Sequence, residues 1–210
     1  MIEIKADRGD LHLARRFFHF FMGATIATVY WQFIEQQNAV AIIGLSTCIV
    51  YVVEQLRINY PEFATKVSFL TAYLLRAEEQ LKESSTLPFV MAILLCIISF
   101  PKMITVAAIY TLSLADPMSA IIGIRFGKKK INDKTLEGSA AFFTATFICI
   151  FFIFYKIVDT QTALILASAT ALITSAFELV KIRLDDNLTI PIFTAVILRI
   201  LCWILNVPLG

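Results

Sequence analysis

The chain has 210 residues, of which 59% are hydrophobic, whereas soluble domains are usually about 45–50% apolar. Its mean hydropathy is +0.79, and several apolar runs approach the roughly 20 residues that cross a bilayer as a helix. With 7 Gly and 6 Pro, the composition favours a helical bundle over a membrane barrel, and the net charge of +2 gives no support for nucleic-acid binding. We therefore predict an all-α integral membrane protein with a single domain, residues 1–210.

Apolar runs separated by short polar corners divide the chain into about seven expected transmembrane helices. The long polar connection at residues 57–85 still contains apolar side chains at helical spacing, so we expect it to form a helix at the membrane interface or to lengthen the second span. The expected spans are residues 17–33, 39–56, 87–100, 103–124, 139–155, 162–180 and 188–207.

The positive residues favour one orientation of this bundle. If the N-terminus is inside, 15 of the 18 Lys and Arg residues fall on the same side, in the N-terminal segment and in the loops at 57–85, 125–134 and 181–187. Positive residues collect in cytoplasmic loops. We expect an N-inside, C-outside topology, and hence a cytoplasmic location for the polar loops.

Asp116 and Pro117 interrupt the fourth expected span. A carboxylate at the bilayer centre costs about 2.5–3.5 kcal/mol, which makes Asp116 a functional candidate. Asp followed by Pro is also a favourable helix start, so the pair is expected to open a half-helix whose N-terminal dipole faces an anion. The residue spacing then places Ala120, Gly123 and Gly127 on the Asp116 face, a pattern that alone favours close helix packing.

A basic loop with a polar helix start follows this span. Arg125, the lysines at 128–130 and Lys134 are typical of a positive-inside loop, but beside Thr135, Glu137 and Gly138 they also suit a polyphosphate. No GxxxxGK[ST] loop occurs in the chain. The pattern is therefore not a Walker loop, and by itself it does not distinguish a nucleotide site from a positive-inside loop.

Further candidate ligands lie near the two ends of the chain. Arg16, His19 and Gly23 share a face of the first helix. Arg15 and Arg16 either anchor the helix in headgroups or meet phosphate, and His19 is either a buried histidine with its hydrogen bonds satisfied or a phosphate contact. Glu178, Asp186 and Asn187 supply oxygen ligands suited to Mg²⁺, or they form a solvated loop, which is the preferred interpretation for Asp185. Arg199, deep in the last span, is expected either to pair with a buried acid or to snorkel outward.

These motifs together resemble those of the CTP-dependent lipid kinase superfamily, which includes dolichol kinase, phytol kinase and fungal-type diacylglycerol kinase. The closest resemblance is to bacterial diacylglycerol/polyprenol kinases. It rests on LADPMSAIIGIRFG at 114–127, K-x-LEGS at 134–139, E-x7-DNLTIP at 178–191, Arg-Arg-x-x-His at 15–19 and Arg-x-x-Glu at 76–79. Family members often have a glycine and aromatic residues after the last of these motifs, where this chain has SSTLPF at 84–89.

The resemblance implies a kinase that phosphorylates a lipid hydroxyl from CTP or another nucleoside triphosphate with Mg²⁺. Diacylglycerol is the first expected acceptor, with a polyprenol, dolichol or phytol-like alcohol as the alternative. The implied catalytic residues are Asp116, Arg16 and His19. The implied nucleotide-binding residues are Arg15, Gly123, Gly127, Lys128, Lys129, Lys130, Lys134, Thr135 and Gly138, and the implied metal ligands are Asp116, Glu137, Glu178, Asp186 and Asn187.

A small membrane transporter is the competing interpretation, because a helical bundle with buried charges also describes carriers. A carrier should present polar groups to both faces of the membrane, whereas this chain concentrates them on one. The sequence does not determine the oligomeric state.

Overall fold

The computed structural model describes residues 8–60, 62–64, 84–132 and 134–209 of the chain. The helices of this part are α1 (Arg8–Phe33), α2 (Gln36–Asn59), α4 (Thr86–Ser99), α5 (Lys102–Phe126), α6 (Leu136–Phe154), α7 (Thr160–Glu178) and α8 (Asp186–Ile204). Two short antiparallel strands, β1 (Lys130–Ile131) and β2 (Lys134–Thr135), form a hairpin between α5 and α6.

The helical membrane bundle expected from the composition is confirmed. Each of the seven expected spans coincides with one helix, although α1 already begins at Arg8. Among the described helices, α2, α5, α6, α7 and α8 are long and apolar enough to cross a membrane, while the apolar helix α4 has 14 residues. Helices suit this apolar sequence because they satisfy their backbone polar groups internally, where a bilayer offers no water.

Side chains at the corners define where three of these helices begin. The Thr135 side chain accepts a hydrogen bond from the Gly138 amide at the start of α6. Asp159 does the same for α7, and Asp185 accepts from the Asn187 amide at the start of α8. Such caps satisfy backbone donors that the first helical turn leaves unpaired.

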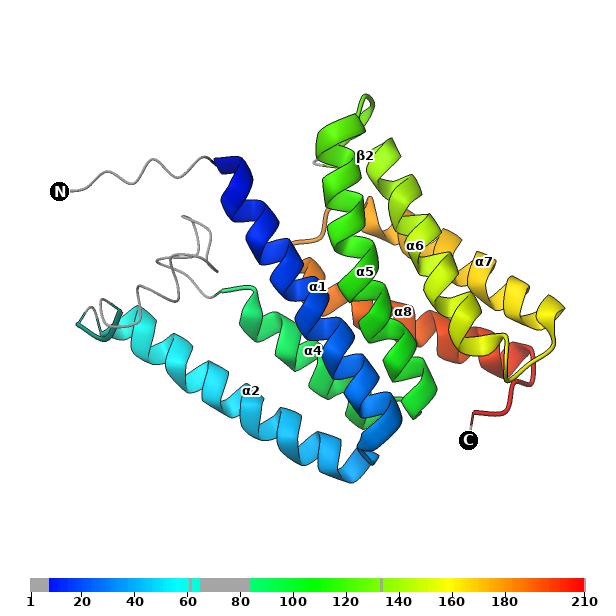
Figure 1. Ribbon diagram of the computed structural model, residues 1–210, viewed down its shortest axis with the longest axis horizontal. Coiled ribbons are helices and arrows are strands. Elements are labelled where there is room, and N and C mark those ends of the chain that lie inside the picture. Colours follow the sequence, from blue (N-terminus) through cyan, green and yellow to red (C-terminus); the bar gives the residue numbers. More distant parts are fainter. Residues whose placement is uncertain (1–7, 61, 65–83, 133, 210) are drawn as a thin grey trace.

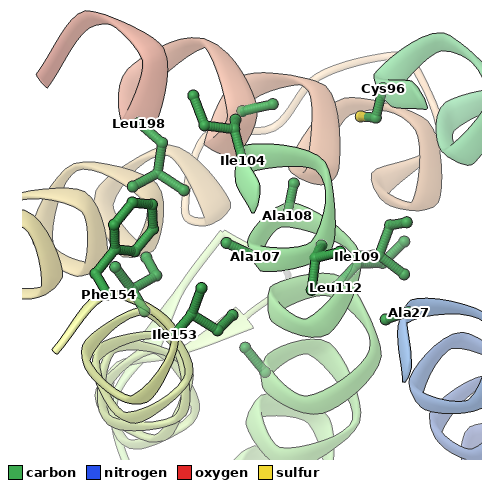
Figure 2. Close-up of a cluster of buried hydrophobic side chains, with 14 of the residues drawn as sticks. Ala27, Cys96, Ile104, Ala107, Ala108, Ile109, Leu112, Ile153, Phe154 and Leu198 are labelled. Atoms are coloured by element: carbon green, nitrogen blue, oxygen red, sulfur yellow. The ribbon is translucent and has the colours of Figure 1, made fainter. Parts of the chain in front are cut away.

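Helix α5 is the centre of the bundle. It packs against α1, α4, α6 and α8, and Figure 1 shows it in green between α1 and α6. Its buried side chains join those of the neighbouring helices, including Phe154 of α6 and Leu198 of α8, as Figure 2 shows. Close contact is needed here because lipid is as apolar as the side chains, so packing holds such helices together. Helix α2, which packs on α4, lies at the side of the bundle (Figure 1).

Continuity of α5 through Pro117 corrects the expected break. The helix runs from Lys102 to Phe126 with Pro117 inside it, so Asp116 does not begin a half-helix and no helix dipole starts there. Proline removes one backbone donor, but packing by neighbouring helices allows membrane helices to tolerate this loss. Asp116 therefore presents its side chain from the middle of a continuous helix.

Three other expectations are refined by the structure. Helix α2 continues to Asn59, which lengthens the second span, whereas residues 65–83 of the expected interfacial segment lie outside the described residues. The basic loop is shorter than expected because α5 reaches Phe126 and a hairpin follows. Arg199 is exposed on α8 and forms no ion pair within the described part, which agrees with the snorkelling alternative.

Candidate active site

A cavity of about 790 Å³ lies where the C-terminal ends of α5 and α7 meet the start of α8 and the N-terminal half of α1. Residues from both ends of the chain line it, and its ionisable side chains come from α1, α5, β1, β2, α7 and α8. Its walls are formed by Arg16, His19, Asp116, Pro117, Ser119, Ala120, Gly123, Ile124, Gly127, Lys130, Lys134, Thr135, Glu178, Ile182, Leu184, Asp185, Asp186 and Asn187.

Lys134 lies at the centre of the charged network in this cavity. Its Nζ is 2.9 Å from Glu178 Oε1 and 2.9 Å from Asp186 Oδ2. Glu178 also accepts hydrogen bonds from Ser119 Oγ at 3.1 Å and from Ser139 Oγ at 2.8 Å. Five elements, β2, α5, α6, α7 and α8, are thus joined through one lysine and one glutamate.

The charge of Lys134 is maintained by these two carboxylates. Burial alone would lower the pKa of the ammonium, but Asp186 and Glu178 outweigh it and hold the pKa above its usual value. The group therefore stays protonated at neutral pH, since its pKa moves further from neutrality. A protonated ammonium at a cavity wall is suited to bind an anion.

Asp116 lines the same cavity, as do Arg16 and His19 of α1. Its carboxylate is half-buried and forms no hydrogen bond with another described residue. His19 packs edge-to-face against Phe89 of α4, with ring centroids 5.0 Å apart, which holds the imidazole in place. Arg15 also lies in α1, but its side chain is outside the described part of the structure.

The spacing of small residues in α5 has a packing explanation, as the spacing alone indicated. A Cβ added at Gly123 would lie 2.7 Å from Thr135 Oγ1, and one added at Gly138 would lie 2.8 Å from the carbonyl oxygen of Ser119. Because neither glycine has a side chain, α5 and α6 can approach closely, and the Thr135 side chain lies near both glycines. Gly138 is buried and lies outside the cavity wall, whereas Gly123 and Gly127 contribute to it.

The expected basic cluster is divided between two surfaces. Lys130 and Lys134 line the main cavity, whereas Lys128 lines a smaller depression with Arg125 and Glu137. Lys129 is exposed, and its backbone amide donates to Glu137 Oε2 at 3.4 Å. Although all these lysines are cationic, only Lys130 and Lys134 line the main cavity within the described chain, so these two can contact a ligand there.

The residues fit a partial magnesium site. No three acidic, His or Cys side chains come together as a metal cage within the described chain. Glu178 has both oxygens engaged, and Glu137 lies at the smaller depression. Asp116, Asp186 and Asn187 nevertheless line one cavity, and Mg²⁺ commonly takes one or two carboxylates while phosphates and water complete its shell.

Comparisons with known proteins found two distant relatives. No family model matches the chain, and no solved structure matches it. An uncharacterised protein of Rickettsia prowazekii is 26% identical over 193 residues, which are 90% of this chain and 94% of that protein. CTP-dependent diacylglycerol kinase 1 of Saccharomyces cerevisiae is 26% identical over 135 residues, or 63% of this chain.

The chain is distantly similar to a CTP-dependent diacylglycerol kinase. It spans about half of the yeast protein, since the match covers 47% of that relative. This similarity agrees with the family resemblance carried by the sequence motifs, of which the Asp116, Lys134 and Asp186 positions meet in the cavity.

The sequence did not predict that Ser119 and Ser139 bond to Glu178, although Ser139 belongs to the polar helix start that was expected beside a polyphosphate. Ser119 follows Asp116 by three residues and so shares its helix face, and Ser139 directly follows the Glu-Gly pair at 137–138. Both positions carried a signal, because small polar residues in membrane helices often bond across to a neighbouring helix. Their partner was not evident, since Glu178 is far away in the sequence.

Proposed function

We propose that this protein is a membrane lipid kinase that transfers the terminal phosphoryl group of CTP to the hydroxyl of diacylglycerol, giving phosphatidate. The observation that carries the proposal is the single cavity in which Asp116 faces a protonated Lys134 and the carboxylate of Asp186. The distant similarity to the yeast diacylglycerol kinase supports both the donor and the acceptor.

Cationic side chains supply the nucleotide half of the proposed site. Phosphoryl transfer depends mainly on positioning the reactants and on stabilising charge at the transferred group. Lys134, Lys130 and Arg16 line the cavity from three elements and are assigned to the phosphates. Asp186 and Asn187 are assigned to Mg²⁺, which when bound would neutralise charge on the phosphate oxygens.

Asp116 supplies the acceptor half. The lipid hydroxyl oxygen forms a bond to the terminal phosphorus, the bond from that phosphorus to the bridging oxygen breaks, and CDP leaves. Asp116 is placed to orient the hydroxyl and to accept its proton, since the carboxylate lines the cavity from within a membrane-spanning helix. Exposed Ile124, Ile182 and Leu184 add apolar surface to the cavity wall, which suits an acceptor with a hydrocarbon portion.

The direct test is phosphate transfer by the purified full chain in nanodiscs. Labelled CTP, ATP and GTP are each supplied with Mg²⁺ and a panel containing diacylglycerol, a polyprenol, dolichol and phytol. We expect labelled phosphatidate to form with CTP as the preferred donor. A labelled isoprenoid phosphate instead would identify the alternative acceptor class and reject the diacylglycerol assignment.

Binding of nucleotide to the same preparation separates a kinase from a carrier. Mg-CTP should raise the thermal unfolding temperature, because a ligand that binds only the folded state stabilises it. If none of the nucleotides binds and no lipid is phosphorylated, the kinase proposal is wrong and a transport function becomes the better explanation.

A further inference from the structure

Glu178 is the most completely bonded carboxylate in the cavity. It is the last residue of α7 and is 4% exposed. Ser119 Oγ and Lys134 Nζ both contact Oε1, at 3.1 and 2.9 Å, and Ser139 Oγ donates to Oε2 at 2.8 Å. Three donors from three elements thus surround one buried group, which leaves little capacity for a further ligand.

Asp186 differs from Glu178 although both contact the same ammonium. The Asp186 side chain is 47% exposed, against 2% for Glu178, and its hydrogen bond to Lys134 is the one that joins it to the described side chains. A half-exposed ion pair exchanges readily with solvent and ions, whereas leaving a buried charge unpaired is costly. Of the two contacts, the one with Asp186 is the easier to break.

Lys134 could direct two donors at a phosphate instead of one if it gave up one carboxylate. An ammonium has three donors, of which the structure directs two at carboxylates. Release of Asp186 would free a donor and remove a negative charge from the neighbourhood of the phosphates. Retention of Glu178 would keep the ammonium at the cavity wall.

We propose that Glu178 is a positioning residue that fixes Lys134 for phosphate binding, and that Asp186 is an exchangeable partner that leaves Lys134 for the divalent cation of the nucleotide. This inference rests on the proposed kinase function and deepens it. It replaces the metal-ligand role that the sequence indicated for Glu178, because both oxygens of Glu178 are already occupied by protein donors. Asp186 keeps its predicted role as a metal ligand.

A double-mutant cycle that measures nucleotide affinity tests the positioning role of Glu178. The variants are Glu178→Gln, Lys134→Met and the two combined, with labelled CTP binding measured on the full chain in detergent. Glu178→Gln keeps the shape and can still bond both serines. We expect each single change to weaken binding about tenfold, and the double variant to bind within about twofold of Lys134→Met, since non-additivity reveals residues that act together.

An additive double variant would overturn the positioning role, because Glu178 would then act independently of Lys134. Ser139→Ala, which removes one of the donors to Glu178, is cycled with Lys134→Met in the same way and decides the question if Glu178→Gln does not fold. Failure of the wild-type chain to bind CTP, ATP or GTP would instead reject the kinase function together with this inference.

The exchange of Asp186 is tested by measuring how CTP affinity depends on Mg²⁺. Asp186→Asn should increase CTP affinity several-fold in EDTA, because Lys134 loses a competing carboxylate, and should reduce the gain in affinity on adding Mg²⁺. Glu178→Gln should weaken CTP binding in EDTA and in Mg²⁺ by similar factors. Weaker CTP binding by Asp186→Asn in EDTA, or an equal loss of the Mg²⁺ effect in both variants, would contradict the exchange.

Discussion

The two ends of the bundle use polar residues in different ways. At the end opposite the cavity, Lys102 donates to the carbonyl oxygen of Ile34 at 2.9 Å and lies over the Tyr30 ring, 5.2 Å from its centroid. Gln36 donates to the carbonyl oxygen of Ile97 at 2.7 Å. These side chains bond to backbone carbonyls at helix ends and so close the corners of the fold.

At the cavity end, charged side chains bond to other side chains across helices. Lys134, Glu178 and Asp186 form a network whose members also line an open volume. Asp116 lines that volume without a hydrogen bond to any described residue. The comparison shows that polar groups tied to backbone carbonyls serve the fold, whereas the cavity end also holds carboxylates with capacity for a ligand, namely Asp116 and the half-exposed Asp186.

Asp116→Asn should have the largest effect on activity, because Asp116 lies at the cavity end of the bundle. We expect a loss of lipid phosphorylation of about 100-fold or more, which is the usual contribution of a positioned acid or base. The measurement is initial rate with CTP and diacylglycerol in nanodiscs. Asp159→Asn is the matched control, since Asp159 caps α7 at the far end and Asn caps helices about as well as Asp. Equal activity of Asp116→Asn and wild type would reject a catalytic role.

Gly138→Ala should damage the support of the cavity. The added Cβ would lie 2.8 Å from the Ser119 carbonyl oxygen and 3.3 Å from Gly123 Cα, both of which belong to backbone that cannot easily move. We expect a loss of about 1–3 kcal/mol in the free energy of unfolding, typical of overpacking. Gly44→Ala, whose Cβ would lie 3.8 Å from Leu94 Cδ1, should leave stability unchanged or increase it. Thermal unfolding compares the two variants, and equal losses would argue against a tight α5–α6 contact.

Lys130→Met and Lys128→Met separate the two parts of the basic loop. Lys130 lines the cavity and Lys128 lines the smaller depression, although both are exposed. Loss of one charge-assisted phosphate contact should raise the nucleotide KM about tenfold for Lys130→Met. The Lys128 variant should stay near wild type. Similar KM values for both variants would indicate that the loop attracts nucleotide only through its total charge.

Lys102→Met should have the smallest effect and should change stability alone. Loss of the bond to the Ile34 carbonyl is expected to lower the free energy of unfolding by about 1 kcal/mol. The nucleotide KM should stay unchanged, because Lys102 lies at the other end of the bundle. A change in KM without a change in unfolding temperature would contradict a purely structural role for this lysine.

The sequence predicted the helical segments well because their apolar runs are long and their corners are polar. It did not predict the continuity of α5, since local rules for proline describe a helix without neighbours. In the bundle, α1, α6 and α8 pack against α5, Pro117 is buried, and the helix persists.

Several residues of the predicted site lie in one cavity, and their roles stay predictions, whereas their arrangement was not predicted. The motif positions Asp116, Lys134 and Asp186 meet in one cavity, as the resemblance implied. Sequence spacing could not show that Glu137 faces a different depression or that Glu178 is enclosed by Ser119 and Ser139. The position of Glu137 depends on the conformation of the β1–β2 hairpin, and the bonds of Glu178 depend on contacts between helices that are far apart in the sequence.

The residues of the cavity also determine when the proposed site can form during synthesis and membrane insertion. Arg16 belongs to α1 and Asn187 to α8, so the wall is complete only after α8 has joined the bundle in the bilayer. A nascent chain that has inserted everything up to α7 would still lack Asp186 and Asn187. The proposed site therefore cannot assemble before α8 has been synthesised and inserted.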